Sequence, residues 1–128
     1  MRTWISLLII VVGAVSLVFG IVFIVQSGSA KQQIADDITP LTLDQVDAQY
    51  DAVVLQHEAI MQKEPLVRAG KAEPSATYNY LTIQRTSLGL TRSNIGQADF
   101  IRTTGIIDII LGVGFLFSGA FLMQKKAA

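Results

Sequence analysis

The stretch GIIDIILGVGFLFSGAFLM, residues Gly105 to Met123, decides the fold of this chain. It is apolar apart from one acid, Asp108, near its beginning. Nineteen residues of helix rise by about 28 Å, close to the hydrocarbon thickness of a bilayer. The stretch therefore predicts a membrane-spanning helix.

A second stretch of this kind is ISLLIIVVGAVSLVFGIVFIV, from Ile5 to Val25, which contains no charge and is long enough to span a bilayer. The alternative is a cleaved signal peptide, because Arg2 supplies a basic start and Gly28 to Ala30 resembles a cleavage site. The apolar part of a signal peptide runs about 7 to 15 residues, so the length favours an uncleaved anchor. The two stretches together predict an all-α membrane protein with two spans.

Composition excludes several classes of protein. The 128 residues have room for one domain, and 51% hydrophobic residues with a mean hydropathy of +0.47 are too apolar for an ordinary soluble domain. Ten basic and ten acidic residues cancel, which argues against nucleic acid as a partner. The chain has no cysteine, so it has neither disulfides nor thiolate metal sites.

Small residues recur every seven positions in both stretches. The two series are Ser6, Gly13, Gly20 and Ser27, and Ala98, Gly105, Gly112 and Gly119. A seven-residue repeat drifts by only about 20° per step around a helix, so each series forms a nearly straight stripe. Small stripes let helix backbones approach closely in lipid. We expect an antiparallel hairpin with facing stripes, which pack either within one chain or between chains.

The charges flanking the spans predict the orientation. Arg2 on one tail, and Lys125 with Lys126 on the other, favour both termini in the cytoplasm. Gln26 to Thr104 would then lie outside the cytoplasmic membrane. The predicted parts are an N-terminal span at 1–27, a helical extracytoplasmic segment at 28–103, and a second span with a basic tail at 104–128.

The segment between the spans is predicted to be helical rather than a flexible linker. The first helix should continue beyond its span until Thr39-Pro40 stops it. A capping box at Thr42 and Gln45 then opens a helix that runs to about Lys63. The apolar face of that helix comprises Leu43, Val46, Tyr50, Val53, His57 and Ile60.

A turn region follows, marked by Pro65, Gly70 and Pro74. Helical character resumes at about Ser75 and feeds into the second span. The pattern favours one helix from there to Met123, with Asn94 and Gly96 as its weak point.

Asp108 is a candidate functional residue, because an ionisable group at the centre of a span costs about 2.5 to 3.5 kcal/mol on insertion scales. One interpretation is a proton or cation relay, or a contact to a basic partner. The other is that Asp108 lies at headgroup depth and leaves Ile109 to Met123 in lipid. We favour the second, since no other charge lies in the segment to form an ion path.

His57 is the other candidate, as the only histidine in the chain. A metal ligand, a pH switch and an axial ligand to a pigment are the functional interpretations. No cluster of histidines and carboxylates has ligand spacing, so we predict no metal and no cofactor and favour a packed, hydrogen-bonded histidine. Arg85, Arg92 and Arg102 are expected to meet lipid phosphates or the acids of the loop.

The sequence contains none of the common enzyme signatures. It has neither a Gly-rich phosphate loop nor a G-x-S-x-G elbow, and His57 is the only histidine that could act as a base. We therefore predict no catalytic residues and no enzyme activity.

The chain resembles a group of small two-span bacterial membrane proteins of uncharacterised function, frequent in actinobacteria. The resemblance rests on the segment QIADDIT with Gln33 to Ile38, the R-T-S-L segment from Arg85 to Leu88, and the Gly-rich last span. Some of the group carry the name aromatic ring-opening dioxygenase, but a non-haem iron site needs several histidine and carboxylate ligands. The resemblance implies a bacterial membrane location and no activity.

These patterns lead to one main hypothesis and two alternatives. The main one is a non-enzymatic integral membrane protein, an accessory subunit or scaffold whose partners are the lipid bilayer and other membrane proteins or further copies of itself. The first alternative is a small oligomeric ion or proton transport element that uses Asp108. The second is an extracytoplasmic binding or sensing module.

Overall fold

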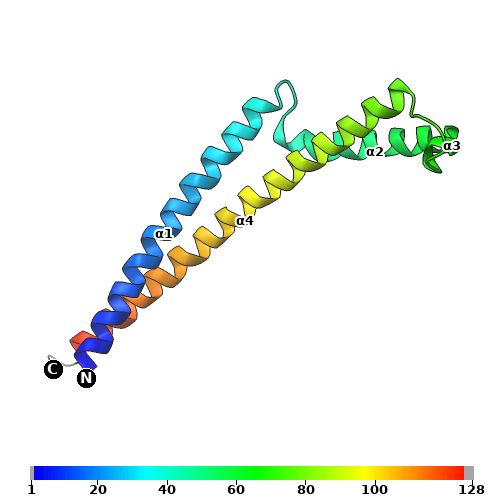
Figure 1. Ribbon diagram of the computed structural model, residues 1–128. Helices are drawn as coiled ribbons and strands as arrows, with labels where there is room; N and C mark the ends of the chain where they lie inside the picture. The colour runs from blue at the N-terminus through cyan, green and yellow to red at the C-terminus, as the bar shows by residue number, and fades with distance from the viewer. Residues whose placement is uncertain (1, 126–128) are drawn as a thin grey trace. The chain divides into compact units, whose positions relative to one another are not determined.

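The computed structural model describes residues 2–125, whose regular secondary structure is entirely helical, as the sequence predicts. In this part of the chain the elements are α1 (Arg2–Asp37), the 3₁₀-helix η1 (Leu43–Gln45), α2 (Val46–Lys63), α3 (Pro65–Arg68) and α4 (Ala76–Gln124) (Figure 1). Helices α1 and α4 are both long and apolar enough to cross a membrane. Lys126, one of the charges behind the predicted orientation, lies outside the described residues.

The chain divides into two compact units. We call residues 2–31 with 97–125 the apolar unit, and residues 32–96 the central unit. Because α1 and α4 are single helices of 36 and 49 residues, each contributes to both units. Helix α4 passes Asn94 and Gly96 without a break, although the sequence marks them as its weak point.

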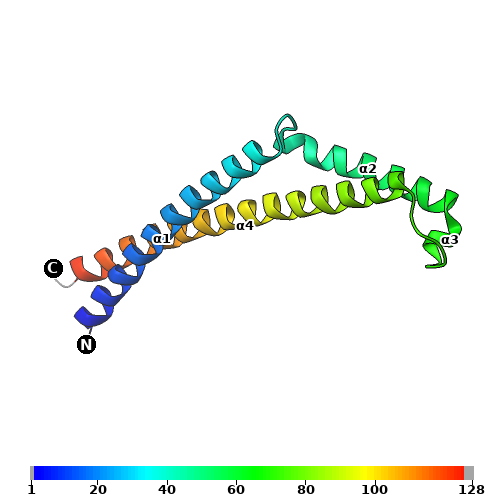
Figure 2. The ribbon, with the colours of Figure 1, turned by 45° about the horizontal axis from the view of Figure 1, so that its top comes forward.

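In the apolar unit, segments of α1 and α4 lie side by side in both views (Figures 1 and 2). The contacting pairs are Ser6 with Gly119, Gly13 with Gly112, Gly20 with Gly105, and Ser27 with Ala98. Numbers rise along one helix as they fall along the other, so the two segments are antiparallel. Most of their apolar surface stays exposed, since only 11% of the most apolar window of each helix is buried.

In the central unit, α2 contacts the first turns of α4. The contacts run from Asp47 near Arg92 to His57 near Thr82, so these helices are antiparallel as well. The buried apolar side chains of this unit are Val46, Val53 and Leu81. Of the predicted apolar face of α2, Val46, Val53 and His57 are buried, and Leu43, Tyr50 and Ile60 are half-buried.

Local chemistry explains where these helices end. Helix α1 ends at Asp37, just before Thr39-Pro40, because proline lacks the N–H that a further helical turn needs. Ser75 caps α4 through its hydroxyl, which accepts a hydrogen bond from the Tyr78 N–H at 3.2 Å. Gly70 follows α3 with a φ of 70°, a left-handed conformation that glycine adopts without strain.

Candidate functional site

The small residues of the two stripes come together in the apolar unit. We call these eight residues the seam: Ser6, Gly13, Gly20, Ser27, Ala98, Gly105, Gly112 and Gly119. All eight are buried, and they are the only buried residues within the described ranges 3–31 and 97–125. The contact between the two helices of this unit is therefore centred on one residue in seven along each helix.

The four central glycines of the seam bring the two backbones into direct contact. A Cβ atom added to Gly20 would lie 2.6 Å from the carbonyl oxygen of Gly105, and one added to Gly105 would lie 2.7 Å from that of Gly20. Gly13 and Gly112 have the same reciprocal relation, at 2.8 and 2.7 Å. In each glycine a hydrogen atom occupies the position of the Cβ atom and points toward the carbonyl oxygen of the other helix. This is the geometry of the Cα–H···O contacts of closely packed helices. Any side chain at these four positions would push the backbones apart.

At the other glycines of the apolar unit, an added Cβ atom would meet either a side chain or open space rather than a backbone atom at the closest point. A Cβ atom on Gly119 would meet the Ile10 side chain at 2.5 Å, and the nearest backbone atom at 3.1 Å. Gly28 and Gly114 have nothing within 4 Å of an added Cβ atom. Gly114 therefore serves as a matched control, because it lies in the same apolar stretch as Gly112 but off the seam.

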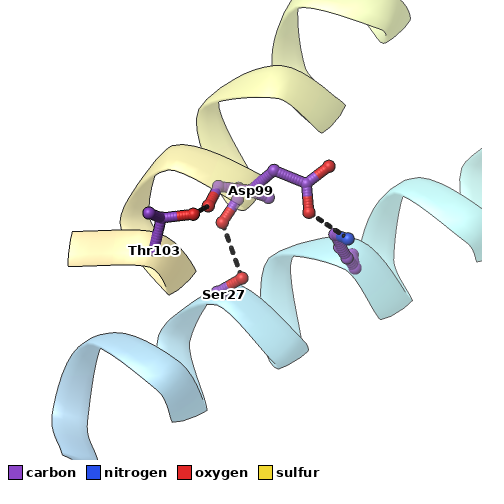
Figure 3. Close-up of polar contacts among 5 residues, drawn as sticks. Ser27, Asp99 and Thr103 are labelled. Carbon is purple, nitrogen blue, oxygen red and sulfur yellow. Dashed lines mark hydrogen bonds and ion pairs between the residues drawn. The ribbon is translucent and has the colours of Figure 1, made fainter. Parts of the chain in front are cut away.

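Polar contacts surround the last pair of the seam (Figure 3). The Ser27 hydroxyl donates a hydrogen bond of 2.6 Å to the carbonyl oxygen of Ala98. One turn further along α1, Lys31 forms an ion pair with Asp99. The Thr103 hydroxyl donates back to the Asp99 carbonyl at 3.0 Å. The pairing of Ser27 with Ala98 and of Lys31 with Asp99 was missed in the sequence, because only the antiparallel register of the seam brings these residues together.

Asp108 lies beside the seam, three residues after Gly105 and four before Gly112, and is half-buried. Within residues 2–125, its carboxyl group makes neither a hydrogen bond nor an ion pair. Because Gly105 pairs with Gly20, a step of three residues along α4 corresponds to three residues back along α1. Asp108 is therefore level with Leu17.

His57 lies in the central unit, where both nitrogens of its ring are hydrogen-bonded. Nδ1 is 3.3 Å from the Arg85 guanidinium and Nε2 is 2.9 Å from the Thr82 hydroxyl. A guanidinium only donates, so Nδ1 accepts, and Nε2 carries the proton and donates to Thr82. Thr82 donates in turn to the Tyr78 carbonyl at 2.9 Å, and the Tyr78 ring centre is 5.2 Å from that of the imidazole. This arrangement favours a structural histidine.

Arg92 makes a second polar contact between α2 and α4. Its Nε lies 2.8 Å from an Asp47 carboxylate oxygen, and its guanidinium lies 5.4 Å from the centre of the Tyr50 ring. Of the three arginines, Arg92 thus meets an acid of the loop, whereas Arg85 contacts His57. The Tyr50 ring also packs near Gly89, where an added Cβ atom would lie 3.3 Å from it.

Two open cavities lie on the central unit. The first has a volume of about 270 Å³ and is lined by Glu58, Met61, Gln62, Arg68 and Arg85. The second, of about 490 Å³, is lined by Pro40, Leu41, Gln49, Ile83, Gln84, Ser87 and Leu88. Neither encloses its contents as a typical small-molecule site does. Along residues 2–125, no three histidine or carboxylate side chains are placed to hold a metal ion.

Comparison with known proteins gives no match: no family model, curated protein or solved structure is similar to the chain. The resemblance to small two-span bacterial membrane proteins therefore stays a prediction from the residues alone. The function has to be argued from the seam and its surroundings.

Proposed function

We propose that the chain is a non-enzymatic integral membrane protein that acts through helix packing, as an accessory subunit or a scaffold. The observation that carries this proposal is the seam together with the surface around it. Many large apolar side chains of the apolar unit are exposed, among them Phe117 and Ile110 at 74% and 65%. Leaving such surface in water costs about 25 cal/mol per Å² relative to burial, whereas lipid solvates it.

In this proposal α1 and α4 cross the bilayer as an antiparallel hairpin. Lipid tails are as apolar as leucine side chains, so they do not drive large side chains together, and close van der Waals contact holds the helices instead. The glycine backbones of the seam supply that contact. Arg2 and Lys125 then lie on the cytoplasmic side, and the central unit is extracytoplasmic.

The position and orientation in the membrane are tested with introduced cysteines, since the chain has none of its own. We expect the full chain to stay in carbonate-washed membranes. A membrane-impermeant maleimide should label Lys71→Cys in intact cells, and Lys125→Cys only after lysis. Release by carbonate would contradict the membrane location, and the reverse labelling pattern would contradict the orientation.

The accessory role is tested by extracting the tagged chain from its own membranes in a mild detergent and measuring the mass and composition of the product. We expect it to travel in fixed stoichiometry with other membrane proteins or with further copies of itself. A monomer without partners that changes ion flux in liposomes would contradict the proposal.

A further inference from the structure

The register of the seam sets the depth of Asp108 once α1 and α4 are placed in a bilayer, as proposed above. Asp108 is level with Leu17, which lies fourteen residues from Lys31 and fifteen from Arg2, with no charge between them. Along α4, the nearest charged residue is Arg102, about 9 Å away on the helix axis. Aspartate has a single methylene and does not reach back to the interface as long basic side chains do. This places Asp108 in the hydrocarbon, against the headgroup interpretation that the sequence favours.

An acid at this depth calls for a partner. Ionisable side chains inside a bilayer almost always face the interior of a helix bundle or water, and pair with one another or with backbone carbonyls. The Asp108 carboxyl group has no hydrogen bond or ion pair within residues 2–125, and part of the side chain is exposed on the surface of the apolar unit. Its neighbours on the exposed side of α4, Ile107 and Leu111, are 50% and 48% exposed and offer an apolar surface around the acid.

A second copy of this chain in the same orientation does not supply the opposite charge. Parallel copies share the depth of each residue. At the level of Asp108, α1 carries no charge anywhere from Thr3 to Ala30, and the nearest cation on α4 is Arg102. A partner that supplies the opposite charge at this depth is therefore a different chain.

We infer that Asp108 is the docking point for a different membrane protein, whose transmembrane helix carries a lysine or arginine at the same depth. The inference rests on the proposed accessory role and names the class of partner. Opposite charges attract strongly where little water screens them, and losing either one leaves the other unpaired in lipid. Ile107 and Leu111 provide the apolar contact on either side of the pair.

The test purifies the tagged full chain from its own membranes in a mild detergent, as wild type and as Asp108→Asn, Asp108→Glu and Gly114→Ala. We expect one membrane protein to co-purify in fixed ratio with the wild type, the glutamate variant and the Gly114→Ala control. Its amount should fall by at least about tenfold with Asp108→Asn, because one member of a desolvated charge pair is removed. A transmembrane segment of that protein should contain a lysine or arginine, and replacing this residue with methionine should give the same loss.

A charge reversal keeps the test decisive if Asp108→Asn disturbs folding. Asp108→Lys, combined with an aspartate at the partner's basic position, should restore co-purification. Retention of the partner by Asp108→Asn, or a partner without an intramembrane cation, would overturn the inference and leave the accessory role standing. A homo-oligomer without other proteins would overturn it and leave the scaffold role, and ion flux lost in Asp108→Asn would then assign the acid to a cation path.

Discussion

The apolar unit and the central unit both pair two antiparallel helices, but they use side chains of opposite size. Gly13 and Gly20 lie seven residues apart in the apolar unit, as Val46 and Val53 do on α2 in the central unit. At the glycines the backbones touch and many large side chains around them are exposed, whereas the valines are buried in the contact. The same seven-residue period thus serves two kinds of packing. Close glycine contacts are typical of helices that pack in lipid, and buried valines are typical of helices that pack in water.

This difference predicts opposite sensitivities. The apolar unit should tolerate substitutions of its large exposed side chains, but it should lose stability when a larger residue replaces a seam glycine. The central unit should lose stability when a buried side chain is truncated. The predictions below test this contrast from the largest expected effect to the smallest.

Gly112→Leu should have the largest effect. A Cβ atom alone would lie 2.7 Å from the Gly13 carbonyl oxygen and 2.8 Å from the Leu17 nitrogen, so the helices must separate. We expect a loss of roughly 3 kcal/mol or more, above the usual range for overpacking, because backbone atoms rather than side chains block the added group. Spin labels on Leu8→Cys and Phe117→Cys, both exposed, should show a longer and broader distance distribution in the variant.

Gly114→Leu is the matched control for this change. It adds the same side chain to the same stretch of α4, but at a position with nothing within 4 Å of a Cβ atom. We expect the distance distribution to match that of the unsubstituted chain. Equal broadening in the two variants would show that leucine disturbs the helix itself and would remove the argument for the seam.

His57→Ala should destabilise the central unit by about 2 to 3 kcal/mol, because it leaves a cavity and takes the hydrogen-bond partner from Thr82 and Arg85. Hydrogen exchange on the full chain should become faster in α2 and unchanged in residues 5–25. His57→Gln should lose less stability, since the amide group can accept a hydrogen bond from Arg85 and donate one to Thr82. If the alanine variant exchanged like the wild type, His57 would have no structural role and the ligand interpretation would regain support.

Ser27→Ala should cost about 0.5 to 1.5 kcal/mol, the net contribution of one neutral hydrogen bond. The substitution removes the 2.6 Å bond to the Ala98 carbonyl and keeps the seam position small. Ser29→Ala is the control, because Ser29 is an exposed serine one turn or less away on the same helix. Thermal unfolding in detergent should separate the two variants. Equal unfolding midpoints for the two variants would mean that backbone contacts alone, without the Ser27 hydrogen bond, hold the helices together at this end of the seam.

The sequence was informative where the signal is local. Helices follow from apolar periodicity and from prolines, and the seven-residue spacing selects the eight residues that the structure brings together in the seam. The partners of His57 were not predictable, because Thr82 and Arg85 lie 25 and 28 residues away and meet it only through the pairing of α2 with α4. That Asp108 lies level with Leu17 was not predictable for the same reason. A residue's level on one helix is defined only by the register of the other.

Asp47→Asn should have the smallest effect, and it separates two contacts of one arginine. The side chains of Arg92 and Asp47 are 52% and 69% exposed, so solvent screening limits their ion pair to about 0.2 to 1 kcal/mol. Arg92→Ala also removes the contact of the guanidinium with the Tyr50 ring, so it should cost more than Asp47→Asn. Hydrogen exchange of α2 at low and high salt measures the stability loss of each variant. Salt should reduce only the part of the loss that comes from the ion pair with Asp47. If both variants lost the same stability and high salt abolished both losses, the contact of α2 with α4 at this point would rest on charge alone. Only the buried valines would then distinguish the packing of the central unit from that of the seam.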